Sequence, residues 1–166
     1  KQGRIFYKRA RISETRGSGG WSPSQPLPAP TSVGSWPQIG MDTAGRLYVA
    51  YAVPVNEERG IYLTRSDDRG KTWSEPQAIF DAAAAGWAMA DHPALAVAPD
   101  GTLHLAWVRG ALPDTWPPQG IYYARSADGG GSWTEPLEIA GPGYDWPRLA
   151  LAGGQVHLLY AEAGSG

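Results

Sequence analysis

Apolar and polar positions alternate in short runs along most of the chain. Three of these runs begin at a proline and recur about every 55 residues, at positions 37–42, 93–98 and 147–152. Apolar residues stand two apart in each run with glycine or alanine between them, which is the period of a β-strand. The small residues on the alternate face predict that these strands lie close to a neighbouring chain segment.

A short glycine-containing turn follows each of the three runs. The turns occupy residues 43–45, 99–101 and 153–154, and the second of them contains Asp100-Gly101. Asp-Gly between two alternating runs is a strong hairpin signal. A second alternating run follows each turn and closes with a large aromatic residue, at 47–51, 103–107 and 156–160. Three similar β-hairpins are therefore expected.

A third and a fourth strand follow the first two hairpins. The third strands are predicted at residues 60–66 and 120–126, and they lead into the related sequences SDDRGKTW and SADGGGSW. The fourth strands are expected to begin at Ser74 and Thr134, each followed by Glu-Pro. Four short antiparallel strands that repeat at this spacing are typical of a β-propeller blade.

The two ends of the chain resemble half blades. Residues 1–30 resemble strands three and four, residues 141–166 supply strands one and two, and complete blades are expected at 31–80 and 81–140. The prediction is an all-β propeller segment with three blades' worth of strands. Since propellers have four to eight blades, the chain is expected to be part of a longer chain or half of a six-bladed ring. In such a ring the strand at 156–160 would pair with the strand at 5–10 of a second copy.

Composition narrows the functional classes. Of 166 residues, 42% are hydrophobic and 18% charged, and the net charge is -2, so a globular protein without a nucleic-acid-binding or anionic-membrane surface is expected. No apolar run is long enough for a transmembrane helix. The chain has no cysteine, and its three histidines lack metal-motif spacing. Neither a metal nor a cofactor is predicted.

The repeated octapeptides carry a family resemblance. Ser-x-Asp-x-Gly-x-Thr-Trp resembles the Asp-box of the bacterial neuraminidase repeat, and the chain resembles sialidase-like β-propellers over nearly its whole length. A copy at residues 13–21 is longer and lacks the aspartate. The resemblance implies that the boxes lie on the rim, away from the catalytic face, and it favours a secreted or cell-surface bacterial protein. The positions that match are Ser66, Asp68, Gly70, Thr72, Trp73, Ser126, Asp128, Gly130, Ser132 and Trp133.

Each part of the box has a physical role that needs no catalysis. The aspartate can accept hydrogen bonds from N–H groups of the turn, and the glycine supplies backbone freedom. The tryptophan is expected to pack between adjacent sheets. We therefore interpret both boxes as structural.

Ligand-binding residues are expected on the opposite face, where the loops are longer and rich in aromatic residues. Aromatic rings beside carboxylates suit sugars, whose C–H faces stack and whose hydroxyls need fixed acceptors. An alternative is that Trp36, His92 and Trp146, which occupy equivalent positions, only cap the blades. The candidate ligand-binding residues are Trp87, His92, Trp116, Trp146, Arg109 and Arg148.

The sialidase resemblance also implies an arginine triad, with one arginine two residues before the proline of a first strand. Those positions hold Ser35, Asp91 and Asp145. A carboxylate would repel the carboxylate of sialic acid. Asp91 and Asp145, with Glu162 as a third carboxylate, could instead serve as acid and base on neutral glycosides.

Three functions follow from these observations. A glycan-binding or interaction propeller without catalysis of its own is favoured. One alternative is part of a glycoside hydrolase, exo-sialidase-like, whose site is completed by further blades or a second copy. The other is a purely structural scaffold.

Overall fold

The computed structural model describes residues 3–113 and 116–164, and the chain is all-β. Its two complete sheets each contain four antiparallel strands in chain order. The first sheet consists of β3 (Ser35–Met41), β4 (Leu47–Val53), β5 (Gly60–Ser66) and β6 (Gln77–Asp81). The second consists of β7 (Met89–Val97), β8 (Leu103–Gly110), β9 (Gly120–Ser126) and β10 (Leu137–Ala140).

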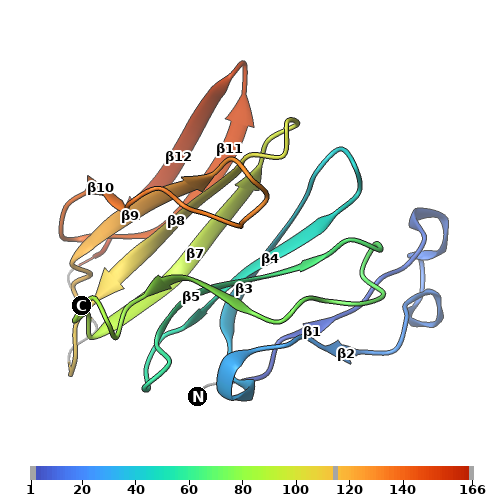
Figure 1. Cartoon of the computed structure of the whole chain (residues 1–166), viewed down its shortest axis with the longest axis horizontal. Coiled ribbons are helices and arrows are strands. Elements are labelled where there is room, and N and C mark those ends of the chain that lie inside the picture. Colours follow the sequence, from blue (N-terminus) through green and yellow to red (C-terminus); the bar gives the residue numbers. More distant parts are fainter. Residues whose placement is uncertain (1–2, 114–115, 165–166) are drawn as a thin grey trace.

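Two strand pairs flank these sheets. β1 (Phe6–Tyr7) pairs with β2 (Gln25–Pro26), and β11 (Tyr144–Ala152) pairs with β12 (Gln155–Glu162). Figure 1 shows the four units as successive blades, with β1–β2 at one side and β11–β12 at the other. The helical elements in the described part of the chain are short 3-10 turns, at Ile12–Glu14, Ser18–Gly20 and Pro30–Ser32, and none is long and apolar enough to cross a membrane.

Strands β3, β7 and β11 lie innermost. β3 packs beside β7, and β7 packs beside β11. Apolar side chains fill the space between the two complete sheets, where Tyr48, Leu105 and Trp107 are fully buried. This arrangement is a partial β-propeller of about three blades, as predicted.

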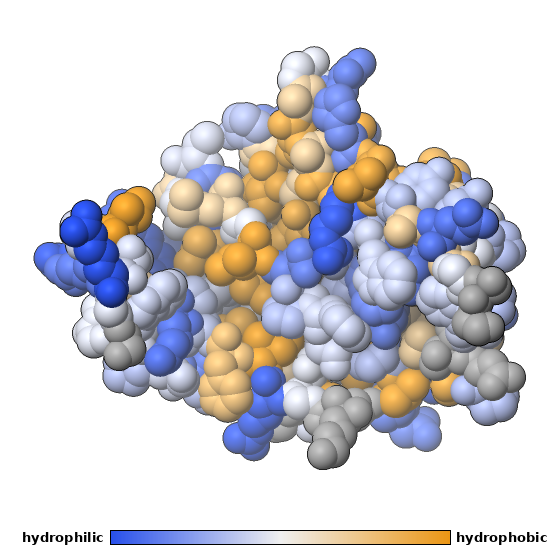
Figure 2. Space-filling model, turned by 180° about the vertical axis from the view of Figure 1, so that it is seen from behind, coloured by the Kyte–Doolittle hydropathy of each residue, from blue (hydrophilic) through white to orange (hydrophobic). Residues whose placement is uncertain are grey.

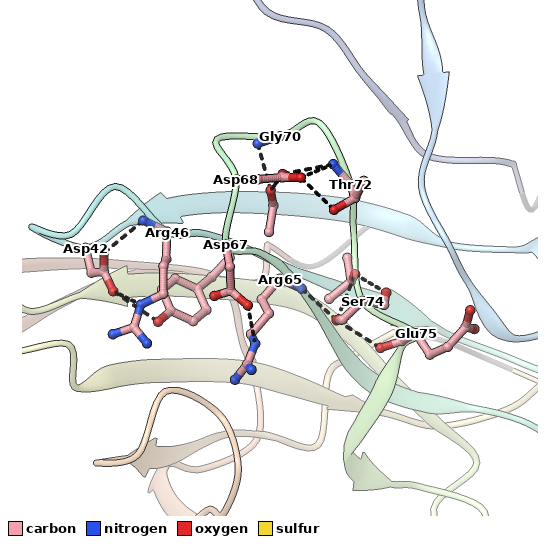
Figure 3. A network of polar contacts seen from close by, with 12 residues as sticks. Asp42, Arg46, Arg65, Asp67, Asp68, Gly70, Thr72, Ser74 and Glu75 are labelled. Carbon is pink, nitrogen blue, oxygen red and sulfur yellow. Dashed lines mark hydrogen bonds and ion pairs between the residues drawn. The ribbon is translucent and has the colours of Figure 1, made fainter.

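The Asp-boxes form the hairpin turns between the third and fourth strands (Figure 3). Asp68 accepts hydrogen bonds from the backbone N–H groups of Lys71 and Thr72, each at 2.9 Å, and from the Thr72 hydroxyl at 2.7 Å. These bonds hold the pKa of the Asp68 carboxyl far below its ordinary value. The Ser66 hydroxyl donates to Asp68 and accepts from the N–H of Gly70. The box is thus a self-contained turn.

Each box also packs against the preceding sheet. A Cβ added to Gly70 would lie 2.3 Å from the Tyr7 hydroxyl, and one added to Gly130 would lie 2.5 Å from a Leu63 methyl. The Trp73 ring meets Tyr7 edge to face, with 5.1 Å between ring centroids. Tyr7 and Leu63 are equivalent residues of successive third strands, so the docking of a box on the sheet before it is a repeated feature.

The structure corrects two strand boundaries. The fourth strands begin at Gln77 and Leu137, not at Ser74 and Thr134, because a proline that cannot donate to the ladder precedes each. The strand expected at residues 5–10 is reduced to Phe6–Tyr7, with isolated bridges at Gly3 and Ala10. One reason is that, in the part of the chain that the structure describes, β1 pairs with β2 alone.

Candidate functional site

Each innermost strand contains, at or near its start, a triplet in which an aromatic residue precedes proline. The strand register shifts between Ser35 and Gln38, between Asp91 and Ala94, and between Asp145 and Arg148. These irregularities are β-bulges. We refer to them as the three bulges.

The aromatic residue of each bulge has a left-handed backbone. The φ angles are 56° at Trp36, 45° at His92 and 51° at Trp146. This conformation costs a non-glycine residue roughly 1–2 kcal/mol. The same strain recurs in three neighbouring strands, which marks the bulges as a functional-site candidate.

Aspartate supports the second and third bulges. Asp91 accepts the backbone N–H of His92 at 2.9 Å, and Asp145 accepts that of Trp146 at 2.6 Å. Both residues are buried, with 8% and 4% of their surface exposed. Their carboxylates therefore hold the backbone that turns the next ring outward.

The bulges bring their rings together. The centroids of Trp36 and His92 lie 4.5 Å apart, and those of His92 and Trp146 lie 6.1 Å apart. Trp116 extends the line, with its centroid 6.2 Å from that of Trp146, and its indole N–H donates to the Gly164 carbonyl at 2.9 Å. We call Trp36, His92, Trp146 and Trp116 the aromatic row. Trp36 is 50% exposed and Trp146 45%, so ring surface remains open to a ligand.

A hydrogen bond beside the row joins the second sheet to the β11–β12 pair. Nδ1 of His92 lies 2.7 Å from Oδ1 of Asp145. Burial lowers the pKa of His92, but the hydrogen bond to Asp145 and the charge of Asp91 outweigh it and leave that pKa raised. Burial raises the pKa of the Asp91 carboxyl. These contacts bring the two carboxylates and the imidazole together.

Two of the predicted ligand-binding residues pair with each other outside the row. The guanidinium of Arg109 lies 4.8 Å from the centroid of the Trp87 ring. Trp87 also contacts Phe80 and Tyr122, with centroid distances of 4.4 and 4.5 Å. This packing places Trp87, with Arg109 over its ring, between the first and second sheets, because Phe80 belongs to β6 and Tyr122 to β9.

The remaining candidates lie on the β11–β12 pair. Arg148 follows the buried Pro147 in β11, and its guanidinium donates to the Pro147 carbonyl at 2.9 Å. Its charge acts on His92 from across the row. Glu162 is exposed near the end of β12, opposite Tyr144. Among the described residues, no group of three or more His, Asp or Glu side chains is arranged to hold a metal ion.

Sequence reasoning placed Trp36, His92 and Trp146 at equivalent positions but did not predict the left-handed backbone or the bond between His92 and Asp145. The signal available was the threefold recurrence of an aromatic residue directly before proline.

A comparison with known protein families agrees with the repeated Asp-boxes and the four-stranded blades. Residues 55–153 match the BNR repeat-like domain, which is more than half of the chain. The chain belongs to this family. No curated protein matches the sequence of this BNR repeat-like protein.

Solved structures share the fold of this BNR repeat-like protein. The endo-arabinase of Bacteroides thetaiotaomicron VPI-5482 is similar with a TM-score of 0.61 and 21% identity, over 87% of this chain and 58% of that one. The Hadza microbial sialidase Hz136 gives 0.55 and 23%, over 70% and 28%. A protein of unknown function from Dyadobacter fermentans DSM 18053 gives 0.56 and 20%, over 77% and 51%.

These similarities identify a sialidase-like BNR, or Asp-box, propeller fold. The chain spans between 28% and 58% of the length of these three structures. At such identities the likeness concerns the fold and not the activity.

Proposed function

We propose that this protein binds carbohydrate through the aromatic row, without catalysis of its own. The observation that supports the proposal is the repeated left-handed bulge, which presents Trp36, His92 and Trp146 side by side at one end of the innermost strands. Sugar rings stack their C–H faces on exposed aromatic rings, and adjacent rings offer adjacent subsites.

The charges around the row favour a neutral glycan. Asp91 and Asp145 flank His92, and Asp145 contacts it directly. An anionic sugar would approach two carboxylates, whose negative charges are offset by one imidazole and Arg148. A neutral sugar meets no such repulsion, and its hydroxyls can bond to the polar groups beside the row.

The role of the carboxylates supports binding over turnover. A general acid or base must reach the proton that it transfers. Asp91 and Asp145 are both buried, and both already accept backbone N–H groups of the bulges. Their positions fit a role in holding the bulges that present the aromatic rings.

Calorimetry with neutral oligosaccharides, selected first on a glycan array, tests the proposal. Trp36→Ala and Trp146→Ala are each expected to weaken binding at least tenfold, or about 1.4 kcal/mol. Met41→Ala is the matched control, because Met41 is 62% exposed at the opposite end of the same strand as Trp36. Unchanged affinity in the Trp36→Ala/Trp146→Ala double variant would contradict the proposal.

A glycoside hydrolase is the second candidate. The raised pKa of Asp91 supports it, because a general acid has to hold its proton more tightly than an ordinary aspartate does. The fold shared with a sialidase and an endo-arabinase is compatible with it. Release of a chromophore from aryl sialosides or arabinosides, abolished by Asp91→Asn, would favour this candidate over binding alone.

A further inference from the structure

We propose that His92 is the specificity-determining residue of the aromatic row: Nε2 of its ring accepts a hydrogen bond from a hydroxyl of a neutral sugar, and Asp145 is the positioning residue that holds the ring for this contact. This role rests on the proposed binding of carbohydrate at the same site. It narrows the ligand to a glycan with an unmodified hydroxyl where it meets Nε2, because the same oxygen carrying a methyl group cannot donate.

Exposed apolar surface does not by itself select a ligand at the row. Figure 2 shows hydrophobic residues gathered in a band on the face opposite to the view of Figure 1. Met41, at the far end of β3 from the row, is 62% exposed as well. Apolar side chains can stack on many sugars, since most sugars have a C–H face. Selection between sugars therefore needs a polar atom in a fixed position.

His92 is the member of the row that can accept a hydrogen bond. The other members, Trp36, Trp146 and Trp116, are tryptophans, whose indole N–H group can only donate. A neutral imidazole has one nitrogen that donates and one that accepts. The hydrogen bond made by one nitrogen decides the role of the other.

Asp145 sets the roles of the two nitrogens. Its Oδ1 lies 2.7 Å from Nδ1 of His92 and also accepts the backbone N–H of Trp146 at 2.6 Å. Since an ionised carboxylate only accepts, the proton between the two side chains belongs to Nδ1. In the neutral ring Nε2 then carries the free lone pair. The row thus presents one acceptor among donors.

Nε2 of His92 is accessible to a ligand. Within the described ranges it makes no hydrogen bond, and it is not among the side-chain atoms that are buried there without a partner. The side chain keeps 16% of its surface exposed. The rings of Trp36 and Trp146 lie beside it, with centroids at 4.5 and 6.1 Å. A hydroxyl that reaches Nε2 therefore belongs to a sugar that also meets an indole.

The imidazole is held from both sides by residues of this chain. Its strand, β7, lies between β3, which carries Trp36, and β11, which carries Asp145. Asp91 accepts the backbone N–H of His92 at 2.9 Å and supports the left-handed backbone at that residue. The ring is fixed at its backbone by one carboxylate and at Nδ1 by the other. Such preorganisation lowers the entropic cost of binding.

The acceptor is lost when the imidazole takes up a proton. The charged groups that act on the ring are Asp91 from its own strand and Asp145 and Arg148 from β11, while β3 contributes the uncharged ring of Trp36. Burial, the largest influence, lowers the pKa of His92, but the bond to Asp145 and the charges of the two carboxylates outweigh it, so this pKa is raised. Below the pKa Nε2 donates, and the sugar oxygen accepts instead.

Calorimetry at two pH values tests this role. The probes are a neutral oligosaccharide selected on the glycan array and its singly O-methylated derivatives. At pH 8.5 one derivative is expected to bind at least tenfold more weakly than the parent, because a methyl ether cannot donate to Nε2. At pH 5 the ether oxygen can accept from the imidazolium, and the difference should shrink to less than threefold. A steric effect of the methyl group would be equal at both pH values.

His92→Phe removes the acceptor and keeps an aromatic ring. The backbone of this position accommodates such a ring, since Trp36 and Trp146 hold indoles in the same conformation. The variant is expected to bind the parent and the methylated derivative within threefold of each other at pH 8.5. His157→Phe is the matched control, because His157 is exposed on β12 and lies outside the row. It should retain the wild-type preference.

Nitrogen-15 NMR of the histidine side chains gives a readout that needs no glycan. At pH 8.5 the His92 ring is expected to carry its proton on Nδ1, and Asp145→Ala should move that proton to Nε2. A proton on Nε2 in the wild-type ring, or a preference for the parent that is equal at both pH values, would overturn the role of His92. Binding without this preference leaves carbohydrate binding standing, whereas the absence of any binding on the array overturns both proposals.

Discussion

Nδ1 of His92 and Oδ1 of Asp145 lie 2.7 Å apart and join the innermost strands of two neighbouring blades. The pKa of His92 is raised in the folded chain. This contact therefore makes its full contribution to stability when the pH is below about 6.5, the pKa of histidine in the unfolded chain. The contribution is lost as the pH rises through the folded pKa. We expect His92→Gln to cost about 1 kcal/mol at pH 5 and less at pH 8.5, by urea denaturation.

His104 provides an opposite control for that experiment. Burial is the main reason that its pKa is lowered, so its neutral form is favoured in the fold. Its contribution is present above the unfolded pKa and is lost as the pH falls. His104→Gln should therefore show the greater cost at pH 8.5. Parallel pH profiles for the two variants would contradict both assignments.

The carboxylate of Asp68 should govern part of the acid stability. Because its pKa is depressed by hydrogen bonds from Thr72 and Ser66, its contribution is present above about pH 4 and is lost as the pH falls toward the folded pKa. Asp68→Asn should lower the melting temperature by several degrees at pH 7 and make little difference at the acid limit. The neighbouring Asp67→Asn should have little effect, since Asp67 is exposed and has only a 3.5 Å contact with Arg65. Thermal scans across pH measure both.

Gly70 and Gly45 separate backbone strain from packing between blades. Both have positive φ, 80° and 81°. A Cβ at position 45 would be 3.8 Å from its nearest neighbour, the Arg69 side chain, whereas one at position 70 would overlap Tyr7. Gly45→Ala should cost about 1–2 kcal/mol from strain, and Gly70→Ala about 1–3 kcal/mol more. Equal costs in chemical denaturation would show that Tyr7 yields freely.

Asp42 is a buried carboxylate that depends on Arg46. Its side chain is 2% exposed and lies 2.7 Å from the Arg46 guanidinium, and Tyr48 donates to it at 3.2 Å. Arg46→Ala should destabilise the fold by about 1–3 kcal/mol, because the carboxylate loses its charged partner. Arg11→Ala, at an exposed pair with Glu14, should change stability by less than about 0.5 kcal/mol. Urea denaturation compares the two, and an equal small effect would mean that water replaces Arg46.

Much of the fold was predictable from sequence because its determinants are local. The turns around Asp68 and Asp128 are closed by residues within four positions of the carboxylate, so their sequence specifies their geometry. The two complete sheets follow from period-two alternation between such turns. The end units were harder to predict, because the length of a strand such as Phe6–Tyr7 depends on the strands that pair with it.

The candidate site was predictable only in part, because its geometry depends on contacts between blades. Equivalent positions identified Trp36, His92 and Trp146, but no local pattern pairs His92 with a residue 53 positions away. Trp87 also shows this limit. Its place in a loop predicted an exposed side chain. Instead, Phe80, Tyr122 and Arg109 surround the ring once the first and second sheets pack together.

The three bulges separate the proposed binding residues from the residues that fix the sheets. At each one the residue before proline leaves the strand ladder, so its side chain is not part of the alternating pattern that fixes the sheet. This end of the innermost strands can therefore change its chemistry through three interchangeable positions while the blades stay the same. Trp36, His92 and Trp146 already demonstrate this, since one scaffold holds an indole, an imidazole and an indole in the same backbone conformation.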